Sequence, residues 1–263
     1  LPGTKSVALT LFTGWMVFGS VGISADGTKW EINPRMVPIP MGASQQLQQS
    51  IATTPVPDVK ARKRVADTDI DWMALIRQRA EMLPFDLPAL SKQLDLTINP
   101  DEIEGVKVNH VVPNEPDPSF KDRLFLYVHG GSYVFDSGDA SVGEAAVIAN
   151  RAKIAVLSVD YRMPPKHPFP AALEDTVIVY KHLLKSMPGK AIAIGGTSAG
   201  GGLALAAVHR LIALELDVPG AIYGGTPWAD LTKTGDSLFT NEGIDRALVT
   251  YDGTLGAAAR LYA

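Results

Sequence analysis

Short apolar runs alternate with helical patterns along the second half of the chain. Runs rich in β-branched or other apolar residues predict strands at 106–112, 124–129, 154–161, 191–196 and 220–225. Helical spacing between them predicts helices at 140–152, 170–186 and 200–214, and the tail 249–263 also has a helical pattern. Strands that alternate with helices predict a parallel sheet, whose strands are buried on both faces.

The first hundred residues lack this alternation. Residues 26–65 are rich in Pro, Gln and Thr, which predicts irregular chain with a helix at 43–51. A helix is predicted at 67–81, capped by Asp67, Thr68 or Asp69, and a short one at 86–96. We therefore expect residues 1–105 to form an N-terminal segment and cap, placed over the ligand-binding edge of an α/β core at 106–263.

An uncharged segment near the start leaves the location of the protein open. Residues 6–25 carry no charge and follow Lys5, as in a signal peptide or a membrane anchor. The alternative is a structured, buried N-terminal segment. The protein is accordingly either cytoplasmic, or exported or membrane-associated through residues 6–25.

Composition excludes several classes of function. A hydrophobic share of 46% and a net charge of −4 are typical of a soluble globular protein, and without a basic stripe we expect no nucleic-acid partner. Because the chain has no cysteine, it forms no disulfide, thiolate zinc site or thiol nucleophile. The sequence has no phosphate-binding loop, dinucleotide fingerprint or metal-ligand spacing, so we expect no cofactor and no metal.

The sequence GTSAG at 196–200 places a serine between glycines, after a predicted strand and before a predicted helix. A nucleophilic serine on a tight strand-to-helix turn has this pattern, and the helix start directs free N–H groups toward developing negative charge. The alternative is a packing turn with a buried hydroxyl. We predict that Ser198 is a nucleophile.

A second glycine motif, HGGSY at 129–133, follows another predicted strand. Gly130 and Gly131 allow backbone N–H groups to face a ligand, as the oxyanion of an acyl-transfer reaction requires. The alternative is an ordinary glycine turn.

With these two motifs and DYRMPPKHPFPAALED at 160–175, the chain resembles the α/β-hydrolases of the hormone-sensitive-lipase type, which include bacterial carboxylesterases. The resemblance covers about residues 100–245, including TPWADLT at 226–232, and more loosely the N-terminal cap. It implies an α/β-hydrolase fold, a mostly parallel sheet flanked by helices, with a helical cap.

The resemblance also implies roles for individual residues. Ser198 matches the nucleophile, and the Ala199 N–H matches one oxyanion donor. The other donors match N–H groups within Gly130, Gly131 and Ser132, where Ser132 replaces a third glycine of the family. Thr197 replaces a more common Asp and marks a GTSAG subgroup. His129 matches a structural histidine rather than the base.

A serine nucleophile needs a histidine base and a carboxylate, which follow the serine along the chain in this fold. His209 is the only histidine after Ser198, and on a helix it lies roughly 16 Å along the axis. We expect His110, His167 and His182 to be surface or structural residues. The sequence therefore predicts that the triad Asp and His, with the last strands, are missing from this chain.

Such a chain would be a truncated form, one chain of a nicked pair or a natural truncation. Its partners would then be a small-molecule ester and the C-terminal segment as a separate chain, with a homodimer as a further alternative.

The resulting hypothesis is a serine carboxylesterase that hydrolyses short-to-medium acyl esters through an acyl-enzyme on Ser198. One alternative is a non-catalytic receptor or pseudoenzyme of the same fold that binds a small molecule, and another is a membrane-associated lipase. Trp30, Trp72 and Phe135 are candidates to line the acyl or alcohol pocket, or are simply core residues.

We predict that residues 1–263 alone hydrolyse esters almost undetectably, because loss of the base lowers kcat by roughly 10⁶. The measurement is hydrolysis of a p-nitrophenyl ester by the purified chain. An ordinary enzymatic rate that Ser198→Ala abolishes would show that these residues themselves contain the base.

Overall fold

The computed structural model describes residues 22–23, 30–31, 38–54, 70–82, 84–241, 244 and 251–263. The chain divides into two units, Leu1–Thr54 and Pro55–Ala263. The first contains strands β1 (Gly22–Ile23) and β2 (Trp30–Glu31), which pair antiparallel, and helix α1 (Gln45–Thr53). The helix predicted at 43–51 is thus confirmed. Apart from 22–23, the uncharged segment 6–25 lies outside the described residues.

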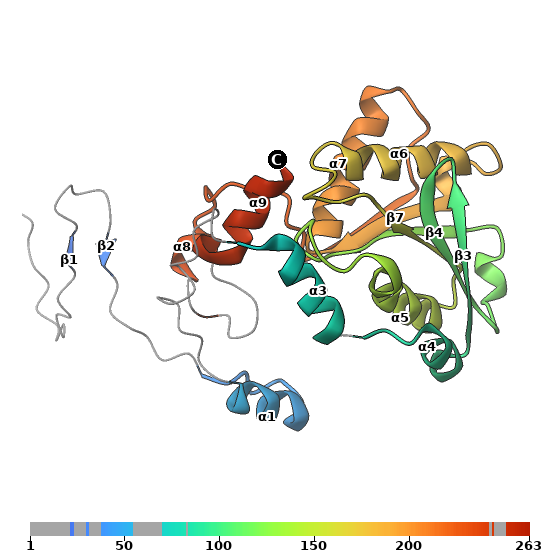
Figure 1. Cartoon of the computed structure of the whole chain (residues 1–263). Helices are drawn as coiled ribbons and strands as arrows, with labels where there is room; N and C mark the ends of the chain where they lie inside the picture. The colour runs from blue at the N-terminus through green and yellow to red at the C-terminus, as the bar shows by residue number, and fades with distance from the viewer. Residues whose placement is uncertain are drawn as a thin grey trace, which may run out of the picture. The chain divides into compact units, whose positions relative to one another are not determined.

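The second unit is built on a six-stranded sheet in the order β3-β4-β6-β5-β7-β8 (Figure 1). Its strands are β3 (Leu96–Ile103), β4 (Val106–Pro113), β5 (Leu124–Val128), β6 (Val156–Asp160), β7 (Ile192–Thr197) and β8 (Ala221–Gly225). The last four are parallel, whereas β4 runs antiparallel to both β3 and β6. All five predicted strands are confirmed, but the sheet is mixed rather than wholly parallel.

Strand β3 was not predicted, because its sequence LTINPDEI is polar and contains a proline. It is an edge strand that pairs with β4 along its whole length, and of its residues only Leu96 and Ile103 are buried. The connecting turn, Glu104 and Gly105, has φ angles of 50° and 87°, as in a type I′ hairpin. The helix predicted at 86–96 ends earlier, at Leu94.

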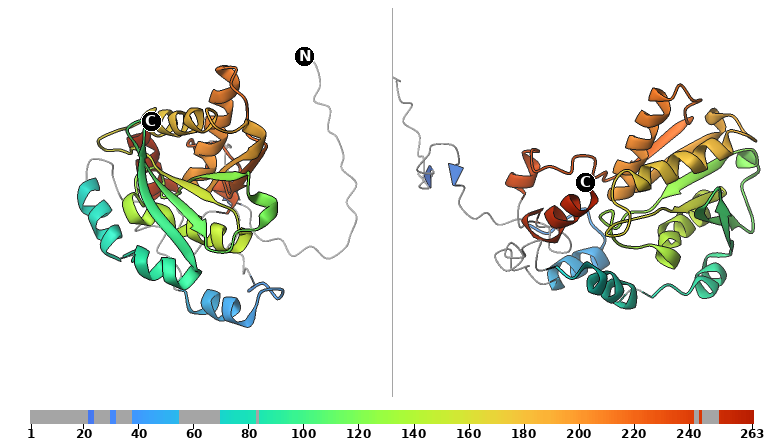
Figure 2. Two further views of the ribbon diagram at one scale, coloured as in Figure 1. Left: turned by 90° about the vertical axis from the view of Figure 1, so that its right-hand side faces the viewer. Right: turned by 45° about the horizontal axis from the view of Figure 1, so that its top comes forward.

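Helices cover both faces of the sheet (Figures 1 and 2). Helices α6 (Ala171–Leu183) and α7 (Ala199–Ala213) pack on one face, and α4 (Leu87–Leu94) and α5 (Gly143–Ala152) on the other. Side chains alternate along each strand, so Leu126 of β5 faces the first pair while Tyr127 faces the second.

The remaining helical elements lie outside these layers. They are α3 (Trp72–Met82), α8 (Ser237–Thr240), a π-helical turn at Tyr251–Leu255, α9 (Gly256–Tyr262), and 3₁₀ turns at Pro118–Phe120, Gly138–Val142 and Gly189–Ala191. Helix α3 starts later than predicted, because the carboxylate of Asp71 accepts the Ala74 N–H at 2.9 Å and caps the first turn. The tail is helical as expected. None of the helices described is long and apolar enough to span a bilayer.

Strand β8 departs from the expected burial. Ile222 and Tyr223 are 47% and 44% exposed, whereas the residues of β6 are almost wholly buried. Within the described residues β8 has a neighbouring strand on one side only, at β7. The expectation that this run is buried on both faces is therefore wrong for the chain as described.

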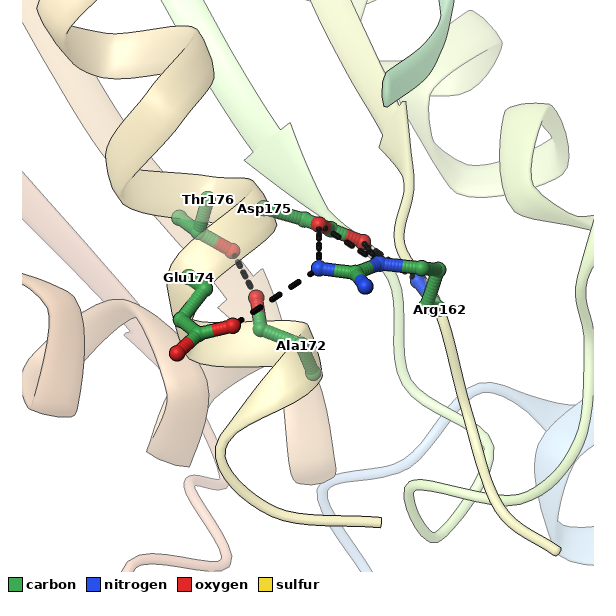
Figure 3. A network of polar contacts seen from close by, with 5 residues as sticks. All are labelled: Arg162, Ala172, Glu174, Asp175 and Thr176. Atoms are coloured by element: carbon green, nitrogen blue, oxygen red, sulfur yellow. Dashed lines mark hydrogen bonds and ion pairs between the residues drawn. The ribbon is translucent and has the colours of Figure 1, made fainter. Parts of the chain in front are cut away.

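An ion pair fixes the loop that follows β6 to helix α6 (Figure 3). Asp175 is buried, and its carboxylate accepts the Arg162 backbone N–H at 2.8 Å and the guanidinium Nη2 at 2.7 Å. The hydrogen bond to Asp175 raises the pKa of Arg162 above its usual value. Glu174 lies farther from the guanidinium, at 3.7 Å, and is largely exposed. The interior carboxylate is thus neutralised at the start of α6.

We predict that Arg162→Ala lowers the free energy of unfolding by about 2–3 kcal/mol, because it leaves the buried Asp175 charge without a cation. The expected loss is below that of a fully buried pair, because the guanidinium is partly exposed. Urea unfolding measures it, with Glu174→Gln as the control, expected to change stability by less than about 0.5 kcal/mol. Equal effects of the two substitutions on stability would show that Arg162 does not stabilise the protein through the buried charge of Asp175.

Candidate active site

Ser198 occupies the turn between β7 and α7 in a backbone conformation that few non-glycine residues adopt, with φ 57° and ψ −121°. Its N–H donates to the Gly225 carbonyl at 2.8 Å. Its own carbonyl accepts the N–H groups of Trp228, at 2.8 Å, and Gly202, at 3.1 Å. The end of β8 and the loop after it therefore hold the strained turn in place from outside.

Two glycines let this turn lie directly against the end of β5. A Cβ atom at Gly196 or at Gly200 would come within 2.0 Å of the Val128 carbonyl oxygen. No side chain fits at either position without separating β5 from the turn. The glycines that flank Ser198 in the motif therefore set how closely the two strand ends approach.

The loop that leaves β5 runs beside the serine. A Cβ atom built on Gly130 would lie 3.6 Å from the Ser198 Cβ. Gly131, Ser132 and Tyr133 all have positive φ, at 99°, 56° and 62°. The Gly131 carbonyl is turned into the loop, where it accepts the N–H groups of the third and fourth residues after it, Val134 at 3.0 Å and Phe135 at 2.7 Å.

Three of the backbone N–H groups that the sequence predicts as oxyanion donors are unpaired in the described chain. The N–H groups of Gly131, Ser132 and Ala199 have no hydrogen-bond acceptor in the described part of the chain. Ala199 is the first residue of α7, so its N–H is one of those left free by the helix geometry. Backbone donors from two strand ends thus flank the Ser198 turn.

His129 is buried beneath the loop. Its ring stacks on Tyr161 with centroids 4.2 Å apart, and the Tyr161 hydroxyl donates to the His129 carbonyl at 2.7 Å. Burial lowers the pKa of His129, which favours the neutral ring. Nδ1 lies 2.7 Å from the Gly130 carbonyl, which only accepts, so Nδ1 carries the proton. His129 therefore braces the loop.

The other four histidines lie elsewhere. His209 is exposed on α7, as expected. His110 contacts Asp101 at 3.1 Å, and His182 contacts Glu104 at 3.3 Å. His167 lies in the loop after β6. Within the part of the chain that the structure describes, the Ser198 hydroxyl has no hydrogen-bond partner, histidine or other.

Helix α3 is tied to the same loop. Arg79 forms a bidentate ion pair with Asp136, in which Nε donates to Oδ1 at 2.7 Å and Nη2 donates to Oδ2 at 3.0 Å. The hydrogen bond to Asp136 raises the pKa of Arg79. The rings of Trp72 and Phe135 lie 6.2 Å apart. The sequence predicts a pocket or core position for both aromatic residues, but it does not predict the ion pair, because the partners are 57 positions apart with no local signal. The side chain of Trp30 lies outside the described residues.

A further acidic residue, which the sequence does not predict to belong to the site, contacts the residue before Ser198. Glu144, in the first turn of α5, accepts hydrogen bonds from the hydroxyls of Tyr127 and Thr197. Its only sequence signal is an acidic residue near a predicted helix start.

Two cavities of the described chain lie apart from Ser198. One, of about 330 Å³, lies beside α3 and is lined by Met73, Ile76, Val134 and Met163 among others. The second, of about 510 Å³, lies over α6 and α7. Ser198 is half-buried and lines neither of these cavities.

Comparisons with known proteins identify the fold of this chain. The family model described as the alpha/beta hydrolase fold matches residues 125–263. The chain is 37% identical over 161 residues to an acetyl-hydrolase of Streptomyces hygroscopicus, across 60% of this chain and 53% of that protein. The chain spans about half the length of the curated relatives it matches.

Solved structures give the same result. The crystal structure of esterase E25 superposes with a TM-score of 0.80 at 46% identity, across 89% of this chain and 72% of that one. An esterase from the bacterial hormone-sensitive lipase family superposes with a TM-score of 0.61 at 31% identity, across 81% and 65%. The strand–serine–helix turn, the glycine loop beside it and these matches together place the chain in the α/β-hydrolase fold family, in its hormone-sensitive-lipase type.

Proposed function

We propose that the whole protein is a serine carboxylesterase that acts on short-to-medium acyl esters through an acyl-enzyme on Ser198. The observation that carries this proposal is the Ser198 turn, held at positive φ with free backbone donors beside it. The relatives named above as esterase and acetyl-hydrolase support the same reaction class. GTSAG at 196–200 supports membership of the subgroup that carries Thr before the nucleophile.

In this mechanism the Ser198 Oγ attacks the ester carbonyl carbon while a base takes its proton. The carbonyl oxygen becomes an oxyanion, held by the N–H groups of Ala199 and of the Gly130–Ser132 segment. The C–O bond to the alcohol then breaks, and the alcohol leaves with the proton. Water attacks the acyl-enzyme in the same way, which releases the acid and restores the serine.

We also propose that the histidine base and its carboxylate come from outside these 263 residues, from the same polypeptide or from a separate chain. Two observations support this. No histidine is hydrogen-bonded to Ser198 in the described chain, and His129 is buried with its Nδ1 engaged by Gly130. In addition, Ile222 and Tyr223 expose apolar surface on a strand with one free edge, where further chain could pair.

A second candidate function is small-molecule binding without hydrolysis. The observation that favours it is the Ser198 hydroxyl without a base in the described chain. The two functions differ in one observable, since a receptor binds an ester and returns it unchanged, whereas an esterase releases alcohol and acid.

We predict that the whole protein is labelled covalently by an organophosphate at Ser198, because only an activated serine is phosphorylated at a useful rate. Mass spectrometry locates the label. Ser198→Ala is expected to abolish both labelling and ester hydrolysis, and Ser237→Ala, an exposed serine on α8, to change neither. A label on another residue, or hydrolysis that survives Ser198→Ala, would refute the proposal.

We further predict that Arg79→Met lowers kcat about tenfold with little change in KM. The substitution removes the ion pair that joins Asp136, at the end of the loop after Gly130, to helix α3. The measurement is steady-state hydrolysis of p-nitrophenyl acetate by the whole protein. Arg77→Met serves as the matched control, since Arg77 is an exposed arginine of the same helix. Equal kcat values for the two variants would show that the ion pair does not hold the loop.

A further inference from the structure

Glu144 joins two strand ends through a single carboxylate. Its Oε2 accepts a hydrogen bond from the Tyr127 hydroxyl at 2.7 Å, and its Oε1 accepts one from the Thr197 hydroxyl. Tyr127 belongs to β5 and Thr197 to β7, which are adjacent parallel strands with Tyr127 opposite Gly195. The carboxylate therefore bridges β5 and β7 at their carboxyl ends.

These two strand ends supply the two halves of the site. β5 ends at Val128 and continues into the loop that carries Gly130 and Gly131. β7 ends at Thr197, the residue immediately before Ser198. A bridge between Tyr127 and Thr197 thus controls the separation between the oxyanion donors and the nucleophile.

The environment of Glu144 suits a fixed carboxylate. The side chain lies in the first turn of α5, where the helix dipole favours negative charge. Burial, and then the hydrogen bond to Glu144, raise the pKa of Tyr127 well above its usual value, so the phenol stays a donor. The Thr197 hydroxyl does not titrate at all in water. Both donors are therefore retained throughout the pH range in which a serine esterase works.

Thr197 is also packed against the group that holds Ser198. A Cβ atom on Gly225 would lie 2.7 Å from the Thr197 Oγ1, so the threonine hydroxyl fills the space beside that glycine. The Gly225 carbonyl accepts the Ser198 N–H at 2.8 Å. A shift of the Thr197 side chain would consequently be transmitted to the hydrogen bond that fixes the strained turn.

We propose that Glu144 is a positioning residue for the reaction, acting through Thr197 and Tyr127 to set the distance from the Ser198 Oγ to the oxyanion N–H groups. This inference rests on the proposed esterase function. It assigns to Thr197 a task that its hydroxyl performs and an isosteric methyl group does not.

The test compares Thr197→Val with Thr197→Ser in the whole protein. Valine keeps the shape but removes the donor, and a displaced nucleophile is expected to lower kcat about 10- to 100-fold while KM changes less than about twofold. Serine keeps the hydroxyl and is expected to restore kcat to within about threefold of the wild type. Thr97→Val is the control, because Thr97 is an exposed threonine of β3 whose hydroxyl donates to the side chain of Asn114, the residue after β4.

Organophosphate titration of Ser198 normalises each rate to the folded, reactive fraction, so a variant that folds poorly does not imitate a catalytic defect. Tyr127→Phe and Glu144→Gln give independent measurements of the same bridge. Each is expected to lower the normalised kcat, and the Tyr127→Phe/Thr197→Val double variant to lose less than the product of the single losses.

The outcomes separate the two proposals. A wild-type protein that hydrolyses esters, together with a Thr197→Val variant of equal normalised kcat, overturns the positioning role and leaves the esterase function intact. A Thr197→Val variant with a lower melting temperature but an unchanged normalised kcat would likewise overturn the positioning role and leave the esterase function intact. A wild-type protein that neither hydrolyses esters nor labels at Ser198 overturns the esterase function, and the positioning role with it.

Discussion

The strained turn at Ser198 is the constraint on which the rest of the site depends. A serine at φ 57° is unfavourable by itself and persists only because its surroundings fix it. Gly225 accepts its N–H, and Trp228 and Gly202 donate to its carbonyl. Since Gly225 ends β8 and Trp228 follows it, the last strand described supports the Ser198 turn as well as the sheet.

The approach of β5 to this turn explains why so much of the site is backbone. The carbonyl oxygens of Val128 and His129 occupy the space that a Cβ atom on Gly200 would need. Beside the serine, the loop after Gly130 turns through successive residues of positive φ, and the N–H groups of Gly131 and Ser132 are left unpaired in the described chain. Neutral, buried His129 and Tyr161 support this loop from beneath without adding a charge to it.

The parts of this arrangement that the sequence predicts are those encoded by neighbouring residues. GTSAG and HGGSY follow short apolar strands, so their place at strand ends can be inferred from local pattern alone. Strand β3 was not predicted, because an edge strand need not be apolar on either face. Two side-chain contacts were not predicted, because each joins segments that only the folded chain brings together. They are the ion pair of Arg79 with Asp136 and the hydrogen bonds of Glu144 with Tyr127 and Thr197. The exposure of β8 likewise depends on what lies beside it.

The two carboxylates Asp175 and Glu144 show how charge is distributed around the turn. Asp175 is neutralised by the guanidinium of Arg162, whereas Glu144 has only two hydroxyl donors and no cation among the described residues. The partners of the two carboxylates also differ in reach. The guanidinium of Arg162 joins Asp175 to a single loop, whereas the two hydroxyls at Glu144 come from two different strands. Glu144 therefore links β5 to β7 directly beside the Ser198 turn, and it does so without adding a positive charge there.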